Sequence, residues 1–489
     1  MREHLFRLPE HAQGGLQAQI RELLVSAILD GHIPAGSALP SCRKLARQLG
    51  VARNTVVIAY QHLVDEGYLE AWERSGYYVN GGVLEGHAKA PHRNPEAPSG
   101  AEPDWNSRLQ VTPSVWPSPA RPKDWQHYRY PFVYGQIDPA LFPISDWREC
   151  SKQALSVSSI RNWANDRIDH DDPDLVEQLQ TRVLPRRGVW AQPEEILVTL
   201  GAQQALYLLA ALLIGAGDRT GIEEPGYADA RNILRMHAGM LEPIPVDGDG
   251  LVIDERIKRC DYLYVTPSHQ CPTTVTMPLE RRMELLKRAG EDDFIIIEDD
   301  YESETNYLGA PTPALKSLDT QGRVIYVGSL SKTLAPGLRL GFMVAPPTVI
   351  EQARALRRFM LRYPPSNNAK AAALFLSLGH HDSLVRRLSL TYRRRWEVMS
   401  AALNEHLPGA AISRTFGGSS FWVHGPQTLD VRKLHQAAAA RSILIEPGEV
   451  HFAANPAPRH CFRLGFSAIA TDRIEAGISA LAVLAHELL

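Results

Sequence analysis

The sequence predicts an α/β chain of two domains, a small helical N-terminal domain and a large domain built on a mainly parallel sheet. Three observations support this prediction. The chain has 489 residues, more than one ordinary domain contains. Residues 81–127 are rich in Pro, Gly, Ala and Ser, so they bury little apolar surface and read as a flexible linker. Across residues 128–489, short apolar runs alternate with helical patterns, as they do where crossover helices join parallel strands.

Composition and charge narrow the classes of protein further. The chain is 44% hydrophobic and 22% charged, which is typical of globular proteins. Its net charge of −3 restricts any DNA-binding surface to a local basic region, such as residues 1–80. The five cysteines are scattered and lack metal-binding spacing. The N-terminus is charged, and the longest apolar stretch, residues 206–217, is too short to span a bilayer. We therefore expect a cytoplasmic protein.

Residues 1–80 carry three helical patterns separated by short turns. Apolar spacing predicts a first helix over residues 16–30. Ser41 is a favourable N-cap for a second helix over residues 42–49, and Gly50 permits the turn that follows. The third helix is predicted over residues 53–66. A short helix, a glycine turn and a longer helix make up a helix–turn–helix.

The third helix and the residues after it predict how this domain contacts DNA. In a helix–turn–helix the N-terminal end of the second motif helix enters the major groove. Arg53, Asn54 and Thr55 occupy that end. Two short strands around Gly76 follow and form a predicted wing beside the groove. The alternative is a small helical bundle whose arginines are merely solvated.

In the large domain, three apolar runs end in polar residues. The runs are residues 262–265, 294–297 and 324–327. The polar residues that follow include His269, Asp299, Tyr301, Ser329, Ser331 and Lys332. Ligands of open parallel sheets bind beyond the carboxyl ends of the strands. We therefore expect these side chains to face one crevice.

This set of residues suits pyridoxal 5′-phosphate (PLP). PLP needs a lysine for its Schiff base, and burial makes a lysine amine more reactive. It also needs a carboxylate beside its ring nitrogen, together with an anion site for its phosphate. Ser329, Ser331 and Arg339 offer hydroxyls and a guanidinium for the phosphate. Residues 201–203 follow an apolar strand and open a long helix, so their N–H groups would add to that site.

The N-terminal residues LPSCRKLARQLGVARNTVVIAYQHLVDEGYLEAWERSGYYV resemble the DNA-binding head of GntR-type regulators. The resemblance includes Arg43 in the first motif helix, Arg53 at the start of the second and the wing glycine Gly76. It implies that Arg43 and Arg53 contact bases or phosphates. It also implies that Thr55 contacts a phosphate and that Gly76 lets the backbone approach DNA closely.

Residues 130–489 resemble fold-type I aminotransferases, specifically the effector domain of MocR-type regulators, through the motifs SLSKTLAPGLRLGF, EDDYESE, EEPGY and CFRLGFS. The resemblance implies a seven-stranded type of mainly parallel sheet and a C-terminal α+β subdomain over about 376–489. It implies that Lys332 forms the aldimine, Asp299 pairs with the ring nitrogen, Tyr301 bonds the ring hydroxyl and Tyr227 stacks on the ring. The phosphate would be held by Gly201, Ala202, Gln203, Ser329, Ser331 and Arg339. Arg463 would grip an effector carboxylate.

Two departures from the family pattern bear on chemistry. Cys271 stands where the family has an aromatic residue or asparagine, and Thr274 stands in place of glycine. His269 is therefore the expected substitute for the missing asparagine beside the ring hydroxyl. The stretch DHDDPDL, residues 169–175, replaces the usual glycine-containing approach to the first helix of the large domain. Both departures put efficient transamination in doubt more than cofactor binding.

The sequence thus predicts a PLP-dependent DNA-binding transcription regulator. An amine, an amino acid or PLP itself would be sensed through aldimine exchange at Lys332. The expected partners are double-stranded promoter DNA, the small effector and a second copy of the chain in a head-to-tail, domain-swapped homodimer. The alternative is a turnover aminotransferase with a vestigial head.

Two of these residues also have interpretations that involve no ligand. Arg463 also reads as one half of a structural ion pair, and His269 as an ordinary loop histidine. Asp229 follows Tyr227 closely and is a candidate lining residue that would favour a second amino group on the effector. No residue pattern predicts a metal site.

Overall fold

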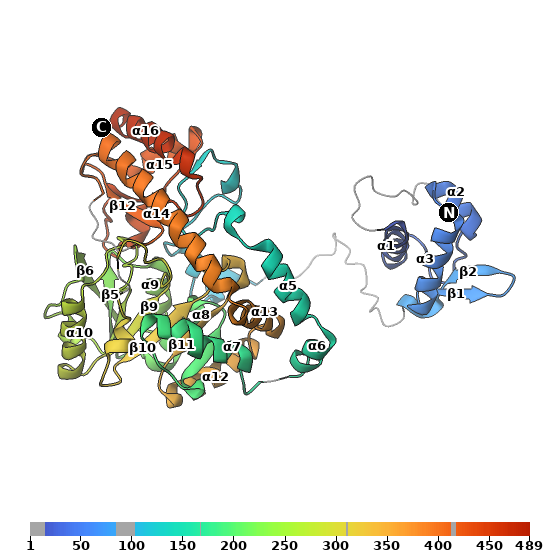
Figure 1. Ribbon diagram of the computed structural model, residues 1–489, viewed down its shortest axis with the longest axis horizontal. Coiled ribbons are helices and arrows are strands. Elements are labelled where there is room, and N and C mark those ends of the chain that lie inside the picture. The colour runs from blue at the N-terminus through green and yellow to red at the C-terminus, as the bar shows by residue number, and fades with distance from the viewer. Residues whose placement is uncertain (1–14, 85–102, 167, 310–311, 412–416) are drawn as a thin grey trace. The chain divides into compact units, whose positions relative to one another are not determined.

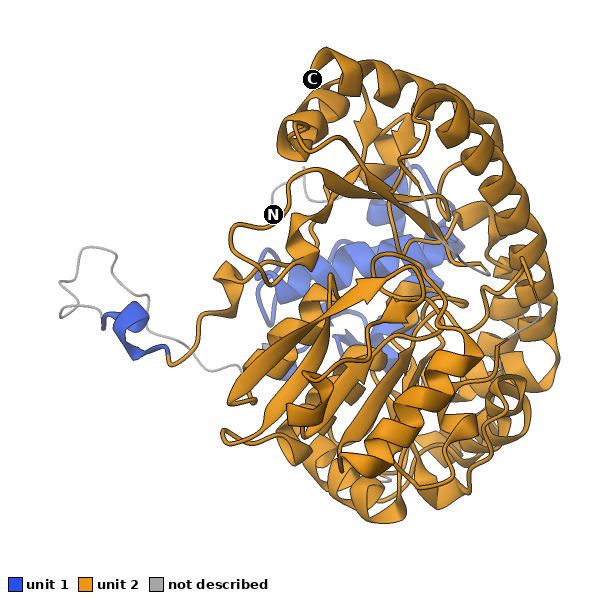
Figure 2. Ribbon diagram, turned by 90° about the vertical axis from the view of Figure 1, so that its left-hand side faces the viewer, with its two compact units in different colours: residues 1–109 blue, residues 110–489 orange. Residues whose placement is uncertain are grey.

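The computed structural model describes residues 15–84, 103–166, 168–309, 312–411 and 417–489. The chain divides into two compact units, residues 1–109 and residues 110–489 (Figures 1 and 2). This division falls inside the stretch that the sequence assigned to a linker, so the boundaries at residues 80 and 127 stay predictions. We call the first unit the head and the second the body.

The head is a winged helix. Its elements are α1 (Leu16–Leu29), α2 (Cys42–Leu49), α3 (Arg53–Asp65), β1 (Leu69–Trp72) and β2 (Gly76–Val79), and the short helix α4 (Trp105–Arg108) follows. The strands β1 and β2 pair antiparallel and form the wing. Leu24, Leu45, Val56 and Leu63 are buried in one core that the three main helices share. The helix–turn–helix predicted from the sequence is confirmed, with α3 one residue shorter than expected.

The body is built on an eight-stranded sheet with the order β4-β11-β10-β9-β8-β5-β6-β7. The strands are β4 (Ile196–Thr199), β5 (Arg219–Glu224), β6 (Met240–Asp247), β7 (Gly250–Leu251), β8 (Tyr262–Val265), β9 (Ile295–Asp300), β10 (Val324–Ser329) and β11 (Gly341–Val344). The strands from β10 through β9, β8 and β5 to β6 are all parallel, whereas β11 runs antiparallel to both of its neighbours. The two-residue β7 adds an eighth strand to the seven-stranded type that was expected, because the chain turns back on β6.

Helices cover both faces of this sheet, as its apolar strands require. Ile297 packs in a core with residues of α8 (Ala202–Leu213) and α12 (Pro347–Leu361). The adjacent Ile296 points to the opposite face, into a core with α10 (Leu279–Glu291). The other helices of this part of the chain are α5 (Ile144–Ala154), α6 (Val157–Trp163), α7 (Pro173–Gln178), α9 (Ala228–Arg235) and α11 (Leu315–Leu318).

The C-terminal part of the body forms a smaller α+β layer. Its helices are α13 (Ser366–Ser377), α14 (His380–His406), α15 (Val431–Ala440) and α16 (Thr471–Glu487), and α14 runs along the body in Figure 1. Strands β12 (Ser420–His424), β15 (Cys461–Gly465) and β14 (Glu446–Pro447) form one sheet. Strand β3 (Tyr130–Pro131), from the start of the body, pairs with β13 (Ile443–Leu444). This pairing brings residues near 134 and 446 together.

Within the described ranges, no helix is long and apolar enough to cross a membrane. All five cysteines are free.

Candidate functional site

A cavity of about 230 Å³ lies at the carboxyl ends of the body's strands. It is lined by nearly all the residues that the sequence assigned to the cofactor and effector: Gly201, Ala202, Gln203, Tyr227, Asp229, Asp299, Tyr301, Ser329, Ser331, Lys332, Arg339 and Arg463. The cavity is also lined by Pro119, Arg121, Tyr134, Gly135, Cys271, Pro336 and Glu446. The predicted convergence of strand ends thus places these groups around one space.

Lys332 is the only lysine among the residues that line this cavity. It follows β10, and its Nζ lies 4.3 Å from the centre of the Tyr134 ring. Burial lowers the pKa of Lys332 below its ordinary value, although the nearby Glu302 carboxylate opposes the shift. A lowered pKa leaves more of the amine neutral, and the neutral amine is the form that attacks a carbonyl group.

Asp299 supplies a buried carboxylate with one oxygen unused. Its Oδ2 accepts a hydrogen bond of 2.8 Å from the Tyr264 hydroxyl. Its Oδ1 is buried and has no partner among the described residues. Burial raises the pKa of Asp299 to about 7. A protonated ring nitrogen placed here would donate to Oδ1 and stabilise the ionised carboxylate, so this residue fits the ring of PLP.

The raised pKa of Asp299 predicts a pH dependence for the cofactor-free protein. An aspartate in the unfolded chain titrates near pH ~4. Between that pH and about 7 the folded form therefore binds more protons, and its stability falls as the pH rises through this window. Asp299→Asn has no such group. We expect the melting temperature of the wild type to fall relative to that of Asp299→Asn as the pH is raised from about 5 to about 7.

The titration of Glu223 does not obscure the comparison between the wild type and Asp299→Asn. Burial also raises the pKa of Glu223 to about 7, and Glu223 is present in both proteins, so its contribution largely cancels in the difference. The measurement is a pair of thermal melts across the pH series. Parallel curves for the two proteins would show that Asp299 titrates at its ordinary pH.

One part of the cavity lining carries the groups that suit an anion. Helix α8 begins at Ala202 directly after Gly201, and no side chain caps its first N–H groups. Arg339 lies beside this turn, where its Nη2 donates to the Leu200 carbonyl oxygen at 3.1 Å. The hydroxyl-bearing Ser329 and Ser331 line the same space. An uncapped helix start, a guanidinium and hydroxyls together form a site for a phosphate.

Two glycines make room for this anion site. Gly201 has φ of 79°, and a Cβ there would lie 3.0 Å from Nη2 of Arg339. A Cβ on Gly341, in the neighbouring strand β11, would lie only 2.6 Å from the Gly201 carbonyl carbon. The turn that presents the helix start therefore depends on the absence of side chains at both positions.

A hydrogen-bonded cluster surrounds Tyr227 on another wall. Gln203 Nε2 donates to the Tyr227 hydroxyl at 3.0 Å and to Asp229 Oδ2 at 2.9 Å. The Tyr227 hydroxyl lies 3.3 Å from the same carboxylate oxygen and donates to it. These bonds fix the tyrosine at the cavity wall, and its stacking on a cofactor ring stays a prediction.

The structure does not bring the His269 side chain to this cavity. The His269 ring is buried, and neither of its nitrogens has a partner among the described residues. Only its backbone is tied to the site, because the Tyr301 hydroxyl donates to the His269 carbonyl oxygen at 2.8 Å. Cys271 lines the cavity instead. Burial raises the pKa of its thiol to about 12, so the thiol is neutral at physiological pH.

Arg463 lines the cavity, and it is also held by an ion pair. Its Nη2 lies 2.5 Å from Oε1 of Glu446, and its Cζ lies 3.7 Å from the centre of the Tyr134 ring. Glu446 also accepts a hydrogen bond of 3.0 Å from Nε2 of His451. Although burial alone would raise the pKa of Glu446, the charge of Arg463 and these hydrogen bonds hold it at about 2. The structure thus shows Arg463 in an ion pair, whereas its grip on an effector carboxylate stays a prediction.

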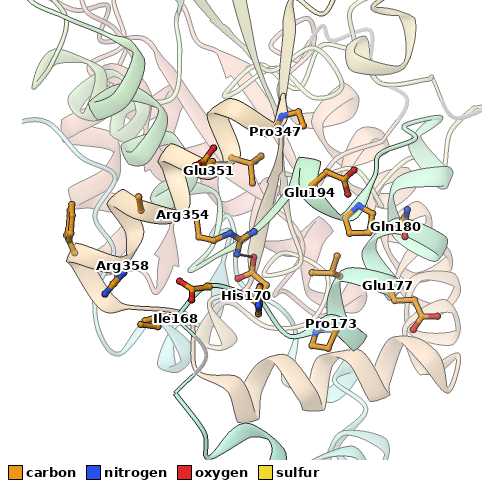
Figure 3. Close-up of a pocket in the computed structure, with 17 residues that line it drawn as sticks. Ile168, His170, Pro173, Glu177, Gln180, Glu194, Pro347, Glu351, Arg354 and Arg358 are labelled. Carbon is orange, nitrogen blue, oxygen red and sulfur yellow. Dashed lines mark hydrogen bonds and ion pairs between the residues drawn. The ribbon is translucent and has the colours of Figure 1, made fainter.

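A larger cavity, of about 1040 Å³, lies between α7 and α12. In Figure 3 the Arg354 side chain extends from α12 toward the chain around His170. Arg354 forms an ion pair with Asp171, at 2.8 Å. None of the described residues that line this cavity is a lysine. The larger cavity therefore lacks the amine that a Schiff-base cofactor requires.

The predicted DNA-contacting residues lie on the surface of the head. Ser41 caps α2 by accepting a hydrogen bond from the Lys44 backbone N–H. Arg43, Arg53, Asn54 and Gly76 are exposed and Thr55 is half-buried. Within the described residues, neither Arg43 nor Arg53 makes a hydrogen bond or an ion pair. Their charges are thus available to phosphates or bases.

Comparisons with known proteins agree with this arrangement. The family of "Bacterial regulatory proteins, gntR family" matches residues 16–79, and the family "Aminotransferase class I and II" matches residues 139–481. The chain is 44% identical to the HTH-type transcriptional regulator TauR of Rhodobacter capsulatus, across 98% of both chains. It is 33% identical to the probable rhizopine catabolism regulatory protein MocR of Rhizobium meliloti, across 97% of this chain and 94% of that one.

Solved structures match the body. A kynurenine aminotransferase of Pyrococcus horikoshii, in complex with PMP, has a TM-score of 0.70 at 27% identity, covering 78% of this chain and 98% of its own. The α-aminoadipate aminotransferase LysN of Thermus thermophilus, complexed with N-(5′-phosphopyridoxyl)-L-leucine, has a TM-score of 0.69 at 26% identity, covering 78% and 96%. The chain therefore belongs to the MocR-type HTH transcriptional regulators, in which a gntR-family DNA-binding head is fused to a class I and II aminotransferase domain.

Proposed function

We propose that this regulator binds PLP in the cavity at the strand ends and senses an amine or amino acid, or PLP itself, at Lys332. The observation that carries the proposal is the presence of a half-buried lysine and the unpartnered Oδ1 of Asp299 in one cavity. Bound PLP supplies a carbonyl group that condenses reversibly with amines. The same chain carries exposed, unpaired arginines on its head, which favours a regulator over an aminotransferase with a vestigial head.

Each wall of the cavity has a distinct part in this proposal. Gly201, Ala202 and Arg339 hold the phosphate, and Asp299 keeps the ring nitrogen protonated. Tyr227 confines the ring, and Tyr301 lies at the cavity wall beside Cys271. The Lys332 amine forms the covalent link and gives way to the effector amine. An effector changes the state of the protein only by its differential affinity for two conformations.

The remaining parts of the proposal concern partners and organisation. Residues 1–80 form the DNA-binding domain, residues 81–127 the linker and residues 128–489 the effector domain. The partner DNA is a double-stranded promoter, and the active species is a head-to-tail homodimer with swapped heads in the cytoplasm. Two heads on one dimer would recognise two half-sites.

A direct test follows the visible absorbance of the protein loaded with PLP. Addition of an amine effector should change the spectrum once per site, without accumulation of a keto acid over many turnovers. Continuous keto-acid production would establish the turnover aminotransferase instead. Failure to bind any promoter DNA would exclude the regulator.

The head makes a separate prediction. Arg53→Ala should weaken promoter binding by about 1–3 kcal/mol, which is roughly 5-fold to 150-fold, because an exposed cation at the start of α3 would be lost from the major groove. The affinity of both proteins should be measured by titration at several salt concentrations, and Arg53→Ala should show the shallower salt dependence if this residue contacts phosphate.

The matched control for Arg53→Ala is Arg393→Ala. Arg393 is an exposed arginine on α14 of the body, paired with Glu397 at 3.3 Å. Its replacement removes the same charge from the chain, and we expect it to leave promoter affinity within about twofold of the wild type. An equal loss in both variants would mean that net charge, and not the head, determines binding.

A further inference from the structure

Of the four cations that line the cavity, one is engaged neither by a carboxylate of the protein nor by the proposed cofactor. Lys332 forms the covalent link in the proposed function, and Arg339 lies at the anion site. Arg463 is held by the half-buried Glu446 carboxylate. Arg121 is exposed, lines the cavity and makes no hydrogen bond or ion pair with the described residues. It is therefore the cavity cation that is available to a ligand anion.

Arg121 lies on a short stretch that precedes the body's sheet, and we call residues 117–121 the bridging segment. Two hydrogen bonds hold the bridging segment on the body. The Ser118 hydroxyl donates to Oδ1 of Asp229 at 2.7 Å, and Asn232 Nδ2 donates to the Pro117 carbonyl oxygen at 2.8 Å. Since Asp229 also accepts a hydrogen bond from Gln203, the segment is connected directly to the cavity wall.

The guanidinium of Arg463, which lies near the Lys332 amine, is already paired with a carboxylate. The Lys332 Nζ and the Arg463 guanidinium both lie over the Tyr134 ring, at 4.3 and 3.7 Å from its centre. An effector amine that replaces Lys332 would bring a carboxylate on its own amine-bearing carbon toward Arg463. The Glu446 carboxylate forms an ion pair with that guanidinium and is held in place by His451. An effector carboxylate at the same position would therefore be repelled by the charge of Glu446.

From this arrangement we infer that Arg121 binds the acid group of the effector, and that this acid group is separated from the carbon that carries the amine. The inference rests on the proposed function, because it assumes that an effector amine replaces Lys332. It makes Arg121 a specificity-determining residue. It also places that residue on the chain that leads toward the head, so binding of the acid group would anchor the bridging segment at the cavity.

The test uses the full-length protein loaded with PLP and isomeric probes that differ only in the position of the acid group. The probes are 4-aminobutyrate and L-2-aminobutyrate, with butylamine as the probe that has no acid group. Half-saturation of the spectral change gives each apparent affinity. We expect the wild type to favour 4-aminobutyrate over both other probes by about tenfold or more, since a charge-assisted hydrogen bond is gained.

Substitutions then identify the residue responsible. Arg121→Ala should lose about tenfold in apparent affinity for 4-aminobutyrate and leave butylamine unchanged, whereas Arg121→Lys should retain part of the preference. Lys123→Ala is the matched control, because Lys123 is an exposed cation two residues away that does not line the cavity. Glu446→Gln should release Arg463 and raise the affinity for L-2-aminobutyrate about tenfold.

The outcomes separate this inference from the proposed function. If butylamine changes the spectrum but the wild type shows no preference for 4-aminobutyrate, or if Arg121→Ala keeps that preference, the role of Arg121 is excluded while amine sensing stands. If Arg463→Ala alone removes the preference, the acid group binds at Arg463. If no amine, butylamine included, changes the spectrum of the PLP-loaded protein, amine sensing itself is wrong and the assignment of Arg121 is withdrawn with it.

Discussion

Replacement of Lys332 by alanine is expected to abolish covalent attachment of PLP and every spectral response to amines. Lys332 is the only lysine among the described residues that line the cavity. Burial lowers the pKa of its amine, which favours the nucleophilic form. The anion site around Arg339 is unchanged in the variant, so PLP should still bind, but without a covalent link. The effect is therefore a loss of chemistry and not merely of affinity.

Borohydride reduction followed by mass spectrometry measures this directly. Reduction should add the cofactor to the peptide that contains Lys332 in the wild type and to no peptide in Lys332→Ala. Lys287→Ala is the control, because Lys287 is an exposed lysine on α10 with only a loose ion pair to Glu291, at 3.6 Å. Labelling of another lysine in the wild type would show that the cofactor is attached elsewhere.

Replacement of Asp171 by alanine should destabilise the body by about 3–5 kcal/mol, the cost typical of leaving a buried charge without its partner. Asp171 forms ion pairs with Arg357 at 2.6 Å and with Arg354 at 2.8 Å. It also accepts a hydrogen bond of 3.2 Å from the Val198 backbone N–H. The Arg357 side chain has 0% exposure, so water cannot replace the missing carboxylate.

Asp166→Ala is the matched control for this prediction. Asp166 pairs with Arg362 at 3.0 Å, and both side chains are about half exposed, at 48% and 60%. An exposed pair of this kind contributes about 0–1 kcal/mol. The free energies of unfolding should be compared in urea by tryptophan fluorescence of the body. Similar losses in the two variants would mean that burial does not determine the strength of the Asp171 pairs.

The Asp171 pairs also explain one of the departures from the family pattern. The stretch 169–175 read as an unusual acidic approach to a helix. In the structure Asp172 caps α7 by accepting from the Leu175 N–H at 3.0 Å, while Asp171 binds the two arginines of α12. The sequence showed the acidic residues, but their partners lie more than 180 positions away. Only the fold could identify what they bind.

The cavity residues also divide into those that the sequence could predict and those that only the fold reveals. Asp299 and Lys332 lie at or just beyond the ends of apolar runs, so parallel-sheet geometry alone predicted that they converge. Tyr134 and Glu446 also follow short apolar stretches, but nothing in the sequence indicates that these two stretches lie side by side. The pairing of β3 with β13 brings them to the cavity. A pairing of two-residue strands over 300 positions apart leaves no pattern that periodicity can detect.

The loop at residues 266–274 shows why a motif position does not determine a side-chain direction. The sequence assigned the His269 side chain to the cavity, yet the chain turns so that Cys271 lines it. Thr274, which stands in place of a glycine, has φ of 64°, in the left-handed region that β-branched residues rarely adopt. Thr274 thus adopts a backbone conformation that suits glycine, and the path of the backbone decides which side chain reaches the cavity.

The close approach of Gly341 to Gly201 has a consequence for genetics. A substitution at Gly341 lies on a strand of the sheet, yet it would push on the turn that presents the helix start to the phosphate. If the cavity binds PLP as proposed, a side chain at Gly341 should impair the response to the cofactor by displacing the Gly201 turn. Changes at two codons far apart in the gene, one for each partner of this backbone contact, should therefore give the same phenotype.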